Sequence, residues 1–205
     1  DVKEVYYYLD ATPTHSYLKM LYKYPQAAFP YERLVRENGE RGVGQPELEL
    51  MDTGVFDDNR YFDVFVEYAQ ADPEDILMRV TAINRGPEPA PLHLLPQLWF
   101  RNTWSWSAGG AKPQLMDVDE AEVLAEHAAL GSYRLYLDGA PGLLFTGNDT
   151  NVPGLYGGVV QGYFKDAFHE RVVDGNAAAV NPGRRGTKMA AWYQQQIAAG
   201  GSREI

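Results

Sequence analysis

The feature that most constrains the fold is a change of hydrophobic period at Glu47. From there apolar and polar residues alternate, and Gly, Pro, Asn and Asp interrupt the pattern about every 8 to 12 residues. LELMD (48–52) and RYFDVFVEYA (60–69) are predicted to form a hairpin around the turn at 56–59. Further strands are expected at 76–84, 92–106, 121–130, 132–139 and 142–149. Eight or more strands with almost no helix between them predict a mainly β fold, a large antiparallel β-sandwich with a few short helices.

The segments on either side of this region are less regular. A strand is expected at 4–9, a helix in THSYLKMLYKYP (14–25) and a second helix in PYERLVRENG (30–39). Residues 151–175 are Gly-rich and irregular, with one helical turn around YFKDAFHE. GTKMAAWYQQQIAA (186–199) fits helical spacing better than strand alternation, so the local pattern alone favours a helix.

Composition limits the possible partners and compartments. A length of 205 residues with 45% hydrophobic residues suits one globular domain, 1–205. A net charge of -10 disfavours nucleic acid and anionic membranes, which recruit clusters of Lys and Arg. The absence of cysteine agrees with a cytoplasmic protein. The chain lacks an initiator Met and begins a new strand at GGSREI (200–205), so we expect a piece of a longer protein.

Motifs for common chemistries are missing. The four histidines are dispersed, GRRGTK (183–188) has the wrong order for a phosphate loop, and no G-x-S-x-G is present, so we predict no metal, no cofactor and no catalytic residue. Asn148-Asp149-Thr150 matches a glycosylation acceptor and is interpreted as a chance turn. The ten carboxylates between Glu47 and Asp75 are interpreted as a solvated edge. Asp52, Asp63 and Glu67 are the acids that a pair of glycosidase carboxylates would most plausibly use.

LWFRNTWSW (98–106) holds three of the four tryptophans. Strand alternation would place Leu98, Phe100, Asn102, Trp104 and Trp106 on one face and the intervening residues on the other. Two interpretations stay open. The aromatic face packs under a partner sheet or domain, or its far end stacks on a sugar, whose C–H face suits a flat ring.

Several long blocks carry a resemblance to a known family. YYYLDATPTHSYLKMLYKYPQAAFPY, LELMDTGVFDDNRYFDVFVEYA, VTAINRGPEPAPLHLLPQLWFRNTWSW, YFKDAFHERVVDG and NPGRRGTKMAAWY are similar to the N-terminal region of bacterial glycoside hydrolase family 63-like proteins, which are related to mannosyl-oligosaccharide glucosidase. The resemblance implies a supersandwich-like β domain that packs on a following (α/α)6 barrel, and the barrel carries both catalytic carboxylates. It also implies a closing strand at 186–199, in place of the locally favoured helix.

We therefore expect a non-catalytic sandwich domain that shapes the active-site entrance of that barrel. If this domain contacts an oligosaccharide, the expected residues are Arg101, Asn102, Trp104 and Trp106. A free-standing carbohydrate-binding module and a purely structural sandwich are the alternatives. A domain separated from its barrel is also expected to expose an apolar face.

Overall fold

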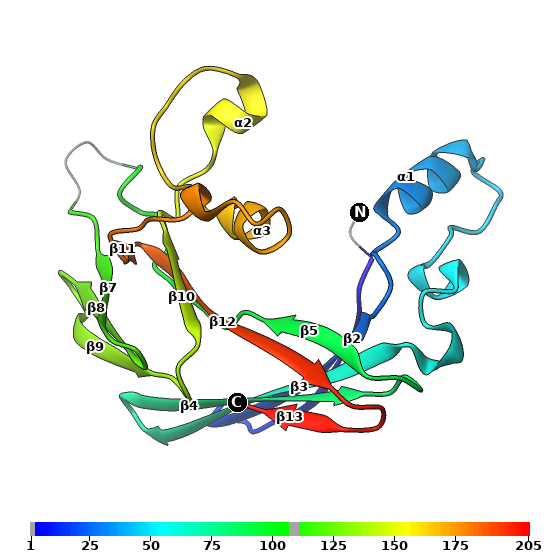
Figure 1. Cartoon of the computed structure of the whole chain (residues 1–205), viewed down its shortest axis with the longest axis horizontal. Coiled ribbons are helices and arrows are strands. Elements are labelled where there is room, and N and C mark those ends of the chain that lie inside the picture. Colours follow the sequence, from blue (N-terminus) through cyan, green and yellow to red (C-terminus); the bar gives the residue numbers. More distant parts are fainter. Residues whose placement is uncertain (1–2, 107–110) are drawn as a thin grey trace. The chain divides into compact units, whose positions relative to one another are not determined.

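The protein is mainly β, with three antiparallel sheets and a few short helices, as the sequence predicts. The computed structural model describes residues 3–106 and 111–205 (Figure 1). The chain forms two compact units, Asp1–Leu92 with Gln195–Ile205 and His93–Gln194. The prediction of one domain over 1–205 stays a prediction.

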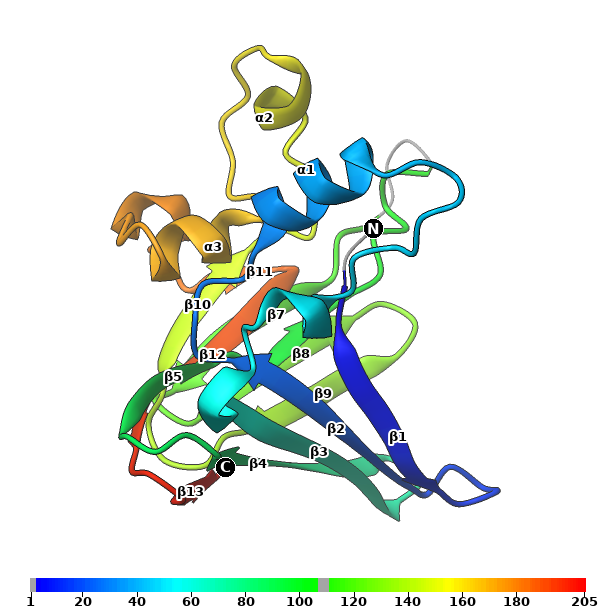
Figure 2. The same ribbon diagram turned by 90° about the vertical axis from the view of Figure 1, so that its right-hand side faces the viewer.

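The first unit is built on a five-stranded antiparallel sheet in the order β1-β2-β3-β4-β13 (Figure 2). Its elements in chain order are β1 (Val5–Ala11), β2 (Tyr17–Pro25), α1 (Tyr31–Glu40), the 3-10 turns η1 (Leu50–Thr53) and η2 (Asp57–Asn59), β3 (Tyr61–Asp72), β4 (Asp75–Asn84), β5 (Ala90–Leu94), which continues into the second unit, and β13 (Ser202–Glu204). The strand that is expected to begin at GGSREI is therefore present, as β13.

The register sorts the side chains of β1 to β4 onto two contrasting faces. Rows such as Leu18–Tyr68–Met78 and Tyr22–Val64–Ala82 lie on one side, which we call the uncharged face. Rows such as Lys19–Glu67–Arg79 lie on the other, which we call the charged face. Phe62, Val64, Val80 and Ala82 are buried on the uncharged face, because alternation sends every second side chain of β3 and β4 there.

A small satellite core forms beside α1. Leu34 from the helix packs with Leu48 and Leu50, and Phe29 and Phe56 cover the cluster. Asn38 holds the next segment in place, since its amide nitrogen donates to the carbonyl of Leu48 and its oxygen accepts from the backbone amide of the same residue. The helix predicted at 30–39 is confirmed, within a residue at each end.

The second unit contains two antiparallel sheets. One has the order β11-β7-β8-β9, and the other runs β10-β12-β5 with β6 also paired to β12. Its elements are β6 (Gln97–Trp99), β7 (Gln114–Asp119), β8 (Glu122–His127), β9 (Gly131–Tyr136), β10 (Gly142–Thr146), α2 (Val152–Tyr156), α3 (Ala167–Val172), η3 (Ala177–Ala179), β11 (Arg185–Gly186) and β12 (Lys188–Ile197), whose last residues belong to the first unit. Phe168 of α3 packs with Leu144 and Ala190 over the second sheet.

Two sequence predictions are wrong and one is right only in part. Residues 17–25 form β2 and not a helix, because both sides of this segment pair with neighbouring strands, β1 and β3. LELMD is no strand: its end is the turn η1, closed by reciprocal hydrogen bonds between Glu49 and Asp52. The long strand expected at 92–106 is two short ones, β5 and β6, separated at Leu95–Pro96, and no strand follows Trp99.

The closing segment is a strand, β12, which pairs with β10 and β6. The local pattern alone predicts a helix here, and tertiary pairing overrides it. β7 was not expected from the sequence, and 151–175 holds two short helices where one turn was expected.

Candidate functional site

The candidate site begins where β6 ends, in residues 100–106 of the second unit. At its start, the backbone amide of Phe100 donates to the carbonyl of Thr187 at 3.0 Å. Two tight turns follow. The backbone amide of Thr103 donates to the carbonyl of Arg101, and the backbone amide of Trp106 donates to the carbonyl of Thr103. This turn geometry abolishes the strand alternation on which the predicted division into two faces depended.

Asp149 organises the first half of the site. Its Oδ1 accepts from the indole Nε1 of Trp104 at 3.0 Å and from Nδ2 of Asn102 at 3.2 Å. Its Oδ2 faces Nζ of Lys112 at 3.3 Å, and that ammonium also lies 5.7 Å from the Trp104 ring centre. Trp104 is buried. The carboxylate therefore anchors two of the four predicted residues, and their polar groups are directed into the protein.

Arg101 and Trp106 form the second half. The guanidinium carbon of Arg101 lies 5.1 Å from the centre of the Trp106 ring, which is a cation–π arrangement. Arg101 is exposed, and Trp106 is 68% exposed. This pair presents a flat apolar ring beside a donor-rich cation, the two features that could engage the C–H face and the hydroxyls of a sugar.

The four predicted residues thus form two pairs with different surroundings. Asn102 and Trp104 support the segment from inside, while Arg101 and Trp106 face outward. Sequence reasoning missed Asp149 and Lys112, which complete the arrangement. Asp149 lies 47 positions after Asn102, and the only local signal was an Asn-Asp turn.

The glycosylation motif at 148–150 belongs to the same structural support. Nδ2 of Asn148, the atom that a glycan would modify, donates to the carbonyl of Phe100 at 2.9 Å. Its backbone amide donates to Oγ1 of Thr187 at 2.7 Å. These contacts fit the interpretation as a structural turn.

The three candidate carboxylates are each engaged in the first unit. Asp63 is buried and binds Nζ of Lys23 and Nε of Arg85, both at 2.7 Å. Asp52 closes the η1 turn through the amide of Glu49 at 2.9 Å. Both carboxylates thus have structural partners within the first unit.

Glu67 is buried and accepts from the hydroxyl of Tyr17 at 2.5 Å and from Arg79 at 2.9 Å. The Tyr17 hydrogen bond, assisted by the Arg79 guanidinium, lowers the pKa of Glu67 below its ordinary value. A carboxylate held ionised in this way is a poor general acid, because a general acid needs a raised pKa. The structure brings none of these acids into the arrangement around Asp149.

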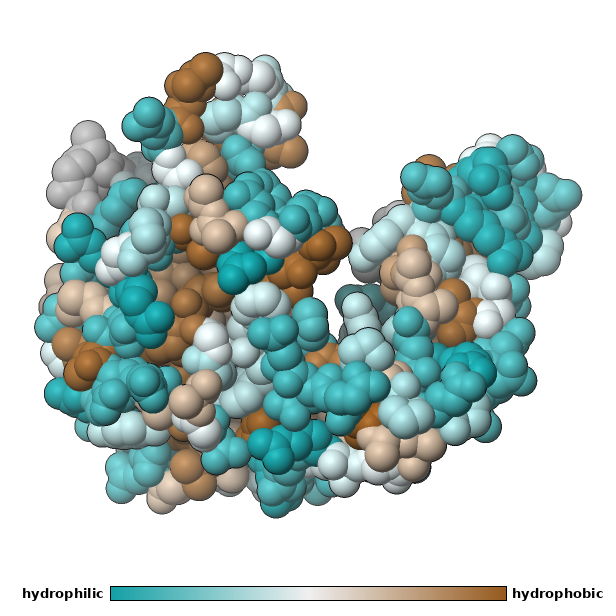
Figure 3. All heavy atoms as spheres, in the orientation of Figure 1, coloured by the Kyte–Doolittle hydropathy of each residue, from teal (hydrophilic) through white to brown (hydrophobic). Residues whose placement is uncertain are grey.

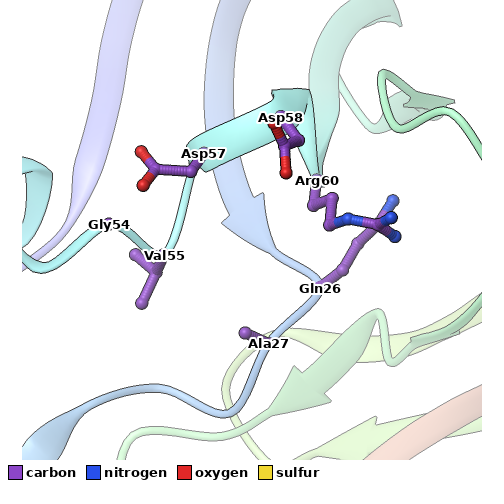
Figure 4. A pocket seen from close by; sticks show the side chains of 7 residues that line it. All are labelled: Gln26, Ala27, Gly54, Val55, Asp57, Asp58 and Arg60. Atoms are coloured by element: carbon purple, nitrogen blue, oxygen red, sulfur yellow. The ribbon is translucent and has the colours of Figure 1, made fainter.

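A shallow cavity of about 440 Å³ lies in the first unit between η2 and the end of β2 (Figure 4). The side chains of Asp57 and Arg60 point to opposite sides of it, and Arg60 pairs with Glu88 at 3.0 Å. Its polar ends do not converge on one point. A binding pocket needs a few polar groups aimed at a shared ligand position, so this cavity is a weaker candidate.

Neither a metal cluster nor a membrane-spanning helix is present among the described residues. No cluster of three or more His, Asp or Glu side chains in residues 3–106 and 111–205 has a geometry that could hold a metal ion. Within the same ranges, every helix is too short or too polar to cross a bilayer.

Comparisons with known proteins gave one match. The chain is 39% identical over 230 aligned positions to the uncharacterized protein YMR196W of Saccharomyces cerevisiae. The match covers 94% of this chain and 21% of the yeast protein, so the chain spans about a fifth of the length of the relative it matches. No family model matches the chain, and no solved structure does.

Proposed function

We propose that the chain is the non-catalytic β-sandwich domain of a larger glycoside hydrolase of the glucosidase type, and that it shapes the active-site entrance of a following (α/α)6 barrel. The blocks quoted above support the enzyme class. The match to a protein about five times as long supports a role as one domain of a larger polypeptide. We also propose a cytoplasmic location, supported by the absence of cysteine.

The observation that carries the substrate contact is the exposed Arg101–Trp106 pair. It is held in place by the Asn102–Asp149–Trp104 hydrogen bonds beneath it. A pre-ordered aromatic ring binds without a large loss of side-chain entropy. We assign Trp106 to stacking and Arg101 to hydroxyl binding at the outer part of the substrate, while Asn102 and Trp104 position them.

The test is hydrolysis of α-linked gluco-oligosaccharides by the complete gene product. We expect activity in that product and none in the 205-residue chain. Trp106→Ala should lower kcat/KM for oligosaccharides by about 5- to 10-fold, the usual loss for one exposed aromatic anchor. The effect should fall mainly on KM.

The matched control is Trp99→Ala, which removes another exposed tryptophan of the same unit. It should leave kcat/KM unchanged. A complete gene product without glycosidase activity would refute the enzyme class, and equal effects of the two substitutions would remove the substrate role of Trp106.

The same exposed pair favours a second candidate, a free-standing carbohydrate-binding module. Calorimetric titration of the 205-residue chain with oligosaccharides distinguishes the two. Binding by the isolated chain at micromolar to millimolar affinity, lost in Trp106→Ala, would favour the module. No binding by the isolated chain, with a Trp106 effect in the complete product, favours the enzyme domain.

A further inference from the structure

The uncharged face of the first sheet carries no charged side chain along β1 to β4, all of whose residues are described. The positions that the register assigns to it are Tyr6, Tyr8, Ala11, Leu18, Met20, Tyr22, Tyr24, Phe62, Val64, Val66, Tyr68, Gln70, Ile76, Met78, Val80, Ala82 and Asn84. On the edge strand β13, Arg203 pairs with Ala82 and is a charged residue on the same side. Such a composition is typical of the face of an antiparallel sheet that packs against another layer.

The buried side chains of this face all lie on β3 and β4. Phe62, Val80 and Asn84 are buried, but near the β1–β2 and β3–β4 hairpins the side chains become exposed. The exposed apolar and tyrosine members of the face are 37% to 83% accessible: Tyr6, Tyr8, Leu18, Tyr24, Tyr68, Ile76 and Met78. Tyr6 and Tyr24 lie toward the end opposite the hairpins, and the others lie toward the hairpins. Leu18, Tyr68 and Met78 form one row across three strands, so the exposure is contiguous and not scattered. The two hairpins lie at the same end of the sheet (Figure 2).

The charged face of the same strands is complete without a partner. Glu67 binds Arg79 at 2.9 Å and Lys19 at 3.5 Å, and Arg79 also faces Glu204 at 3.8 Å. Tyr7 and Leu77 are exposed on the charged face, but they lie on β1 and β4 and are not paired with each other. On the uncharged face, Leu18, Tyr68 and Met78 are paired in one contiguous row. Contiguous exposed apolar patches on folded proteins mark interaction surfaces.

The border of the exposed half is acidic. The β3–β4 hairpin tip holds Asp72, Glu74 and Asp75, whose carboxylates stand next to Ile76. An anionic membrane would be repelled by this border. A second copy would bring the same carboxylates against one another only if the hairpin tips met, whereas a surface edged with Lys or Arg would be attracted wherever it docks.

We propose that the hairpin half of the uncharged face is the surface on which another domain of the same, longer polypeptide packs, through an apolar patch bordered by Lys or Arg. The inference rests on that part of the proposed function which makes the chain one domain of a larger protein. It is supported by the yeast relative, in which about four fifths of the chain lie outside the matched region. It does not depend on the enzyme class.

The test uses the absence of cysteine from the chain. Met78→Cys places a thiol at the β4 end of the exposed row, and Val35→Cys places one on the exposed side of α1 as a control. The maleimide labelling rate of each is measured by mass spectrometry of the peptide that contains it, in the 205-residue chain and in the complete gene product.

We expect both thiols to react fast in the dilute 205-residue chain. In the complete product, Met78→Cys should react at least about tenfold more slowly, because labelling would then require local opening, and Val35→Cys should be unchanged. Leu18→Cys repeats the test at a second position of the row.

Every other result overturns the proposal. Equal rates for Met78→Cys in the two proteins mean that nothing covers the face. Slow labelling in the 205-residue chain means that the chain covers it itself, or that a second copy does if the rate falls with concentration. Equal slowing of both thiols means that protection is not confined to this face. Glycosidase activity is scored separately, so a protected but inactive product refutes the enzyme class alone.

Discussion

At the scale of single residues, Trp104 and Trp106 show how two neighbouring tryptophans differ in role. Trp104→Ala removes a buried ring and leaves Asp149 without an indole donor. We expect it to lower the free energy of unfolding by about 3 kcal/mol. Trp106→Ala should cost about 0.5 kcal/mol or less, because its ring is exposed. Urea denaturation of both variants measures the difference, and equal losses would contradict the assignment of one ring to support and the other to the surface.

The hydrogen bond from Tyr17 to Glu67 should make stability depend on pH. It lowers the pKa of Glu67 from its ordinary value of 4.5, so its contribution to stability is present above about that pH and is lost as the pH falls through the lowered folded-state pKa. Tyr17→Phe removes the bond. The stability difference between the unmodified chain and Tyr17→Phe should therefore be largest at neutral pH and shrink as the solution is acidified below 4.5.

Tyr24→Phe is the matched control, since this exposed tyrosine lies on the same strand. Its effect on stability should be small and independent of pH. Denaturant titrations at several pH values between neutrality and acid provide the data. A Tyr17→Phe difference that stays constant on acidification would show that the bond does not act through the ionisation of Glu67.

At the scale of elements, Gly186 permits the close approach of β11 to the end of β10. A Cβ atom at this position would lie 2.1 Å from the carbonyl oxygen of Thr146, which is backbone and cannot rotate away. Gly186→Ala should therefore cost more than about 3 kcal/mol or prevent folding of the second unit. Gly39→Ala in α1 meets open space and should stabilise by about 0.5 to 1 kcal/mol, because alanine loses less backbone entropy. Thermal unfolding followed by circular dichroism compares them; a tolerated Gly186→Ala would contradict this strand packing.

The local hydrophobic pattern predicts an element correctly where its period is that of the secondary structure the segment adopts. β3 alternates cleanly and its pattern predicts a strand, whereas the local pattern of β2 predicts a helix. The evidence for β2 as a strand lies elsewhere in the chain: Lys19 and Lys23 face Glu67 and Asp63 across the strand pair, more than 35 residues away. The local pattern of this segment, with Tyr17, Met20, Leu21 and Tyr24 at helical spacing, contains no information about that distant pairing. β12 was assigned correctly only because a family resemblance overrode the same kind of local signal.

At the scale of the whole molecule, the candidate site was predictable in part for a similar reason. The tryptophan-rich segment could be located by composition, and its aromatic and polar residues do gather at one place. Their division into a supporting pair and an exposed pair could not be predicted from the segment itself. It depends on Asp149 and Lys112, which come from later in the chain. Strand alternation placed Trp104 and Trp106 together, and the turns at 101–106 separate them into a buried and an exposed ring.

Asn84 joins distant parts of the chain into the first unit and so provides a test of how that unit is assembled. Its amide nitrogen donates to the carbonyls of Glu88 and Ile197, and its Oδ1 accepts from Gln26 and from the amide of Gly86. Asn84 is fully buried, so its replacement by alanine would leave the carbonyl of Ile197 and the amide of Gly86 without a partner in a buried place. The groups of Gln26 and Glu88 would lose the same partner in a partly buried one.

Asn84→Ala should therefore lower the free energy of unfolding by about 3 kcal/mol, as expected when a buried hydrogen-bond network is broken. The matched control, Asn151→Ala, removes the cap at the start of α2 and a hydrogen bond to Asp166, both of them exposed, and should cost about 1 kcal/mol or less. Hydrogen exchange adds spatial detail: the amides of Val80 and Ile205, which bond to each other's carbonyls across β4 and the C-terminal segment, should lose protection in Asn84→Ala. Unchanged protection there would mean that the two ends of the first unit are held together without Asn84, and that the network only fills space beside them.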